Sequence, residues 1–271
     1  MNHLIVRLAL FLLAAHFGLT IWTLADPSMV SITGRLQMPA MLLFSLLHAS
    51  YMLGWKRALQ FFALCSVISW GFEHTGVATG MIFGNYHYSD KLGYKLGHVP
   101  IVIPLIWFMM MYPSYIIANL IGNGCPTANQ GSTGRIIWLS LLGAVTVTAW
   151  DLAVDPVFSN LGFWTWVDGG PYFGVPLHNF GGWLMTTFTI FFVYRLWERQ
   201  TGIEPMGPTT TLIAWMPPFI YGCQALSVFV RPNLGIIVFF AMGFPLLAAI
   251  NRCWPEPAAL RGNGENGKKP R

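Results

Sequence analysis

The feature that most constrains this chain is its set of long apolar segments. Runs such as LIVRLALFLLAAHFGLTIWTLA and NLGIIVFFAMGFPLLAAI approach or reach the ~20 residues that a helix needs to cross hydrocarbon. Hydrophobic residues make up 55% of the 271 positions and charged residues only 9%, too few to surround a soluble core. The sequence therefore predicts an all-α, polytopic membrane protein.

About eight apolar segments can be separated along the chain. Seven spans remain an alternative, because one segment is short and the last two share a tight Arg231-Pro232 junction. The segments lie near residues 4–25, 38–54, 58–77, 99–121, 136–158, 180–197, 210–230 and 232–250. We expect a single transmembrane helical domain over 1–255 and a disordered, polar C-terminal tail over 256–271.

The basic residues predict the orientation in the membrane. With eight spans, the terminal segments and the even-numbered loops hold 11 of the 15 Lys and Arg residues. Because positive charge concentrates on the cytoplasmic side, both termini are expected to face the cytoplasm of a bacterial or archaeal cell. The surplus positive charge is explained by the membrane, and no nucleic-acid partner is expected.

Three of the ten acidic residues stand apart. Seven lie in loops, at segment ends or in the tail, where water is expected to reach them. The other three, Glu73, Asp151 and Asp155, lie inside apolar segments, where a charge costs at least ~2.5–3.5 kcal/mol and usually has a function. Glu73 lies near the end of the third segment and the two aspartates near the end of the fifth. Both ends are predicted to lie on the same, non-cytoplasmic side.

Asp151 and Asp155 are four residues apart, which places both carboxyl groups on one face of a helix. Two carboxyl groups in one apolar pocket cannot both ionise cheaply, so one is expected to keep a proton near neutral pH. Structural roles remain open for all three acids. Asp155 before Pro156 could end the helix, Asp151 could hydrogen-bond across the bundle, and Glu73 could form a cap or a salt bridge.

The two loops expected on this side are rich in aromatic residues. An interfacial aromatic belt explains many of them, but aromatic faces also stabilise cations by roughly 0.5–2 kcal/mol each. Asn85, Asn179 and His178 could orient water or an acid there. The candidate substrate-binding residues are Trp150, Tyr86, Trp164, Trp166, Tyr172, Asn179, Trp183 and His74.

No metal or cofactor site is predicted. The seven histidines form none of the clustered HxxxH or HxxHH boxes of membrane di-iron enzymes, and the four scattered cysteines form no CxxC pair.

The segment from Trp70 to Trp183 resembles the integral-membrane carotenoid biosynthesis family. The resemblance rests on WGFEHTGVATGMIFGNYHYSDKLGYKLGHVPIVIPLIWFMMMYPSY and AWDLAVDPVFSNLGFWTWVDGGPYFGVPLHNFGGW, which carry a glutamate, FGxYxY, WDxxxDP and GxPxxNFxGW in that order. Its characterised members are carotenoid 1,2-hydratases, including those acting on monocyclic carotenoids and bacterioruberin precursors. The resemblance implies a carotenoid substrate such as lycopene or a monocyclic carotenoid. It also implies contact with membrane lipid and with other carotenoid-pathway enzymes, and no cofactor.

The implied reaction suits the acids. A carboxylic acid protonates the terminal double bond of an acyclic end group, and water captures the tertiary carbocation to give a 1-hydroxy carotenoid. We predict Asp151 as the proton donor, Asp155 as its base partner and Glu73 as a tuner or alternate donor.

Three other functions remain open. DLAVD also fits the DxxxD element of intramembrane prenyltransferases such as carotenoid elongases, although a second NDxxD element is missing. A membrane lycopene cyclase would begin with the same protonation and end by ring closure. A carotenoid-binding protein without catalytic activity would leave the pigment unchanged.

Overall fold

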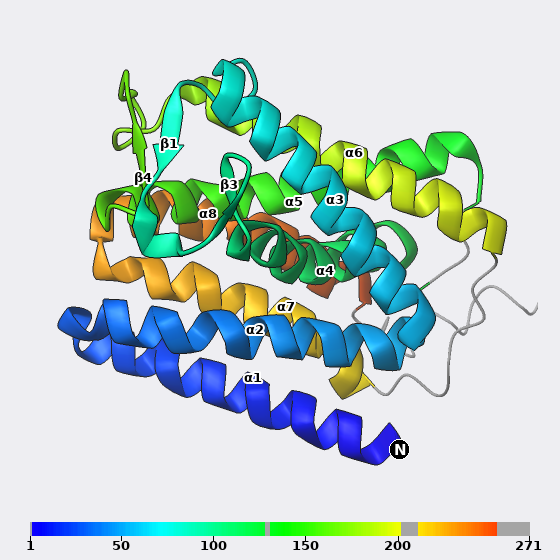
Figure 1. Ribbon diagram of the computed structural model, residues 1–271. Helices are drawn as coiled ribbons and strands as arrows, with labels where there is room; N and C mark the ends of the chain where they lie inside the picture. The colour runs from blue at the N-terminus through cyan, green and yellow to red at the C-terminus, as the bar shows by residue number, and fades with distance from the viewer. Residues whose placement is uncertain (1, 128–130, 202–210, 254–271) are drawn as a thin grey trace, which may run out of the picture.

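The computed structural model describes residues 2–127, 131–201 and 211–253, and within them it is a bundle of eight α-helices (Figure 1). The all-α prediction is confirmed. The predicted tail at 256–271 lies outside the described residues. The helices are α1 (Asn2–Ala25), α2 (Val30–Leu53), α3 (Trp55–Thr79), α4 (Val102–Asn123), α5 (Thr133–Asn160), α6 (Leu177–Thr201), α7 (Thr211–Ser227) and α8 (Pro232–Cys253).

Within the described residues, five segments are helical, long and apolar enough to cross a membrane. These are His3–Ala25, Pro27–Leu53, Val102–Asn123, Thr133–Asn160 and Asn233–Asn251. Helices α3 and α6 have sufficient length, 25 residues each, but carry more polar side chains. Helix α7 is shorter, with 17 residues.

Helix α2 begins at Val30, eight residues before the segment predicted near 38–54. The prediction missed the first turns of the helix because they contain polar residues. Their side chains are satisfied by α1: Thr23 donates a 2.7 Å hydrogen bond to Thr33, and Gln37 donates a 3.1 Å hydrogen bond to Thr20. Hydropathy alone therefore marks the start of this helix too late.

The centre of the bundle is α4, which packs against α2, α3, α5, α7 and α8. Residues on all of its faces are buried, among them Phe108, Tyr112 and Ile116, as expected for a helix that is apolar all round. Helix α1 packs on α2 and α7 at one side, and α6 packs on α3 and α5 at the other.

Two short antiparallel pairings lie at one end of the bundle (Figure 1). Strand β1 (Tyr86–Tyr88) pairs with β4 (Trp164–Trp166), so that Tyr86 lies opposite Trp166 and Tyr88 opposite Trp164. Because side chains alternate along a strand, these four rings share one buried face. The two loops predicted to meet at one end of the bundle therefore do so, joined by backbone hydrogen bonds.

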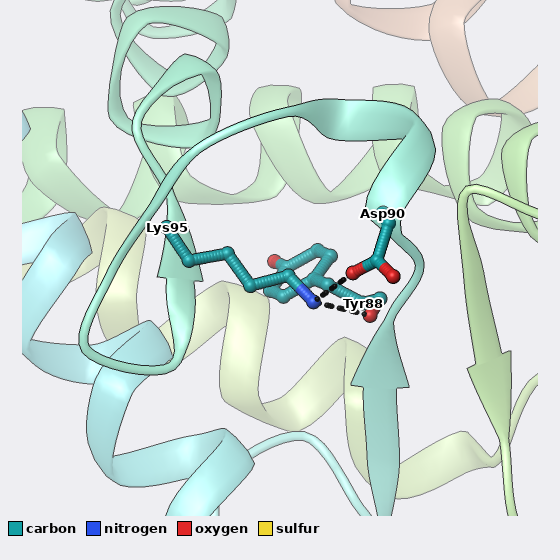
Figure 2. A network of polar contacts seen from close by, with 3 residues as sticks. All are labelled: Tyr88, Asp90 and Lys95. Atoms are coloured by element: carbon teal, nitrogen blue, oxygen red, sulfur yellow. Dashed lines mark hydrogen bonds and ion pairs between the residues drawn. The ribbon is translucent and has the colours of Figure 1, made fainter.

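Strands β2 (Lys95–Leu96) and β3 (Val99–Pro100) form a hairpin that contacts α3 and is tied to β1 by a side chain. Figure 2 shows how Lys95 joins them: its Nζ donates a 3.0 Å hydrogen bond to the carbonyl oxygen of Tyr88 and lies 3.1 Å from Oδ1 of Asp90. Lys95 thereby ties the hairpin to the end of β1, which carries the inward-facing Tyr88.

One expectation about charge is wrong. The sequence pattern places Arg195 and Glu198 at the end of an apolar segment, where water would reach them. Both are instead buried within α6, with 0% and 1% of their surface exposed. Helix α6 continues to Thr201, and neighbouring helices cover this part of it.

Candidate active site

Asp151 and Asp155 lie on one face of α5, as their spacing predicts, and are 0% and 4% exposed. The amide nitrogen of Asn179, at the start of α6, donates hydrogen bonds to Oδ2 of both, at 3.0 Å for Asp151. The two carboxyl groups also lie within hydrogen-bonding reach of each other. One amide thus holds two acids together inside the bundle.

The helix does not end at Asp155, because α5 continues through Pro156 to Asn160. A proline lacks the N–H group that would bond the carbonyl oxygen four residues earlier, here that of Leu152. The hydroxyl of Tyr172 supplies the missing donor with a 3.1 Å hydrogen bond to this oxygen. Tyr172 therefore anchors the 161–176 loop to α5.

Glu73, on α3, is 4% exposed and accepts hydrogen bonds from three aromatic side chains. Its Oε2 accepts from the hydroxyls of Tyr86 and of Tyr88 (2.7 Å), and its Oε1 accepts from Nε1 of Trp107 at 3.0 Å. Burial, and then the Glu73 carboxyl beside them, raises the pKa of both tyrosines well above its ordinary value. Both hydroxyls therefore stay protonated and available as donors.

A cavity of about 160 Å³, here called the acid chamber, connects these groups. Glu73, Asp155 and Asn179 line it together with an aromatic wall in which Trp107 stacks on Trp183 at 4.0 Å between ring centroids. Its described lining also includes Tyr86, Tyr88, Trp150, Trp164 and Trp166. The chamber combines carboxyl groups with aromatic faces, the two features expected of a site that forms a carbocation.

Away from the acids, the acid chamber runs toward α2 and opens to the exterior of the molecule. The exposed residues Ser31 and Arg35 line it there, and Phe158 and Leu161, at and just after the end of α5, are also part of its lining. Gly34 lies between Ser31 and Arg35 in the sequence of α2. A Cβ at this position would meet no atom within 4 Å, so the space beside it is open. Four methionines lie along the way, Met38, Met41, Met109 and Met110, whose side chains adapt to an irregular apolar guest.

Most of the predicted site residues come together around this chamber, and three take other places. Asp151 lies behind Asp155 and does not line the chamber. Tyr172 binds the backbone of α5, and His74 stacks between Trp70 and His98 on the other side of α3.

Trp107 is a site residue that the sequence reasoning missed. It lies in the apolar run VIPLIWFMMMY, where it resembles one more lipid-facing aromatic residue. A chemical argument could have identified Trp107. A buried indole N–H needs an acceptor, and Glu73 is one of few acids inside the spans. Tyr88 was noted only as a loop aromatic, and its bond to Glu73 depends on the pairing of β1 with β4.

Comparisons with known proteins give a consistent result. The family model described as "Carotenoid biosynthesis protein" matches residues 29–248. A bisanhydrobacterioruberin hydratase of Haloarcula japonica is 30% identical over 132 residues, which cover 48% of this chain and 42% of that protein. The alignment thus spans less than half of either protein. No solved structure matches the chain.

The family match covers most of the eight-helix bundle, including the three acids and the aromatic chamber around them. This integral membrane chain belongs to the carotenoid biosynthesis protein family.

Proposed function

We propose that this protein is a carotenoid 1,2-hydratase, which adds water across the terminal double bond of an acyclic carotenoid end group. The observation that carries the proposal is the pair Asp151–Asp155, joined by Asn179, in which Asp155 lines an aromatic chamber together with Glu73. The name of the relative from Haloarcula japonica supports the same reaction class.

The aspartate pair supplies the proton. Among the described residues no cation lies in salt-bridge distance of either carboxyl group, so two negative charges there would be uncompensated. The pair therefore keeps one proton, shared under the hydrogen bonds of Asn179. Because Asp155 lines the chamber and Asp151 does not, we reverse the roles predicted from the sequence: Asp155 donates this proton to the alkene, and Asp151 acts through Asp155.

Glu73 and the aromatic wall stabilise the cation that follows. Three neutral donors hold the Glu73 carboxyl in place, and their hydrogen bonds oppose the burial that disfavours its charged form. The stacked faces of Trp107 and Trp183 line the same space. Oriented carboxyl oxygens and aromatic faces both lower the energy of a positive charge developing between them.

Water completes the reaction and restores the acids. Its oxygen bonds to the tertiary carbon, and the proton that it loses passes to the Asp151–Asp155 pair. The pair regains the proton that it gave to the neighbouring carbon. The sum is the addition of one water molecule, with no net change in protonation and no oxidant or reductant.

The size of the acid chamber indicates how the substrate binds. A dry cavity of about 150 Å³ in another protein holds a single benzene molecule, so 160 Å³ suits one end group and not a whole polyene. The rest of the chain would leave past Gly34 and the methionines toward the lipid. The enzyme then acts on one end group at a time.

The proposed orientation places both termini in the cytoplasm and the acid chamber at the non-cytoplasmic end, following the positive-inside rule. A reporter fused after residue 271 would test it, because a cytoplasmic reporter is expected to be active only inside the cell.

The function is tested by expressing the protein in a lycopene-producing host and measuring pigment masses. We expect pigments heavier by one water per modified end group, and their loss with Asp155→Asn. Ring closure without a change in mass would indicate a cyclase, and a longer carbon chain a prenyltransferase. Unchanged pigment that copurifies with the protein would indicate a binding protein.

A further inference from the structure

A second cavity lies outside the acid chamber, at the same end of the bundle. This cavity, here called the polar vestibule, has a volume of about 510 Å³ and is lined by the end of α3, the start of α6 and the two loops that carry β1 and β4. Its polar lining residues include Thr79, Asn85, Asp168 and His178. Asn85, Asp168 and His178 are exposed, so bulk water reaches this cavity.

Three segments line the polar vestibule and the acid chamber with closely spaced residues. Phe83, Trp166 and Asn179 line the acid chamber. Asn85, Asp168 and His178, one or two residues away in each segment, line the polar vestibule. A single layer of chain therefore separates the water-filled side from the acids.

Phe83 is the centre of this layer. Its ring lies between Gly76 of α3 and Gly182 of α6, and a Cβ built on either glycine would come within 2.6 Å of a ring carbon. Only glycine at both positions leaves room for the ring. Phe83 is 2% exposed and lines the acid chamber, so it fills the gap between the two helices without being held by a polar contact.

A water-binding group lies just inside this layer. The indole N–H of Trp166 is buried beside the acid chamber and has no hydrogen-bond partner among the described residues. A buried N–H of this kind is usually satisfied by a bound molecule such as water. The chain continues from Trp166 through Val167 to Asp168, which lines the polar vestibule.

The proposed reaction requires a route for water into the acid chamber. Each hydration consumes one water molecule, yet a polyene that fills the mouth near Gly34 blocks that side. The remaining walls of the chamber are largely aromatic or aliphatic. Water therefore needs a separate entrance, and a closed partition keeps the aspartate pair dry and protonated between turnovers.

We propose that the polar vestibule is the entrance for the water consumed by the reaction, and that Phe83 is the partition through which this water passes. The proposal rests on the proposed hydratase function. Because the aspartate pair recovers its proton in each cycle, the vestibule delivers water and no net protons.

The test is a reversible block of the polar vestibule. Ala78 is exposed and lines it, so Ala78→Cys in a background whose four native cysteines are alanine introduces one small reactive group. The matched control is Val167→Cys, 57% exposed in the loop beside Asp168 but outside the lining. Both are treated in membranes with a charged, membrane-impermeant methanethiosulfonate, and the rate of hydrated lycopene formation is measured before and after reduction.

We expect the reagent to slow the Ala78→Cys enzyme by about tenfold or more, with recovery on reduction, and to change the Val167→Cys enzyme less than twofold. Failure of the reagent to label Ala78→Cys, or labelling without loss of rate, overturns the proposed entrance while leaving the hydratase function intact. An unsubstituted enzyme that forms no hydrated product overturns the hydratase function, and the entrance with it.

Discussion

The two ends of the bundle both bury charged side chains, and they satisfy them differently. At the end opposite the strands, Arg195 donates a 2.8 Å hydrogen bond to Asn119 and lies 4.5 Å from the ring centre of Tyr115, whose hydroxyl donates a 2.6 Å bond to Glu198. At the strand-bearing end, Glu73, Asp151 and Asp155 receive hydrogen bonds only from neutral donors among the described residues.

This difference separates a charge-compensated cluster from the uncompensated one that we propose as the reactive site. Arg195 and Glu198 bring opposite charges to the same face of α6, so the cluster compensates itself, and its side-chain hydrogen bonds join α6 to α4. The three acids have no such compensation and cost free energy in the resting protein. A site that holds uncompensated acids is set up to give a proton away and to receive a positive charge.

The largest effect is expected at the acid end. Asp155→Asn removes the proton that reaches the alkene, so the rate of hydrated product should fall by about 10²–10⁴-fold. Its melting temperature in detergent should stay the same or rise, because a buried carboxyl without a cation is removed. Asp90→Asn, at an exposed position of the same end, is the control. A clear loss of stability with Asp155→Asn would contradict the comparison.

The next effect is expected at the other end. Arg195→Leu leaves Glu198 buried without the opposite charge on its own helix face, which should destabilise the protein by about 3–5 kcal/mol. The measurement is thermal unfolding in detergent, with Arg199→Leu, an exposed neighbour, as control. Stability should return in part with Arg195→Leu/Glu198→Leu, and a double variant as unstable as the single one would argue against charge compensation.

A smaller effect is expected from Trp107→Phe. This change keeps a ring against Trp183 but removes the N–H that binds Glu73, a bond to an acid worth about 1.5–3 kcal/mol. We expect a tenfold or greater loss of hydration rate. Trp138→Phe, 54% exposed on α5, is the control and should lose less than twofold. Equal rates for the two variants would contradict a role of Trp107 in the reaction.

The smallest effect is expected from Tyr172→Phe. Without its hydroxyl, the carbonyl oxygen of Leu152 loses the donor that replaces the one missing at Pro156. We expect a loss of about 0.5–1.5 kcal/mol in unfolding free energy. The comparison is Tyr94→Phe, 79% exposed, which should unfold like the unchanged protein. Identical melting of both variants would show that Leu152 finds its donor elsewhere.

The placement of the acids inside the bundle could be predicted from the sequence because its signal is local. Asp151 and Asp155 share a helix face through their spacing alone, and a charge inside an apolar segment stands out. The helical class followed from the apolar runs in the same way. The meeting of β1 with β4 was expected only as a shared end of the bundle, and their register depends on side chains that pattern reasoning does not pair.

Longer-range contacts escaped prediction for a physical reason. Trp107 reads as a lipid-facing aromatic residue until its N–H is traced to Glu73, 34 positions away. Arg195 and Glu198 lie near the end of an apolar run, where charge counting assumes water, yet packing against α4 and its neighbours buries them. The division of the acids between Asp155, which lines the chamber, and Asp151 behind it also depends on packing that spacing cannot specify.

The pairing of β1 with β4 has a consequence for biogenesis. Tyr86 and Tyr88 follow Glu73 closely and can reach it early in translation, but their strand partner is synthesised 76 to 80 residues later. Asn179, which joins the two aspartates, emerges later still. A chain cut short after α4 would therefore hold Glu73, one of the three buried acids, without the strand partner or the aspartate pair that complete the proposed site.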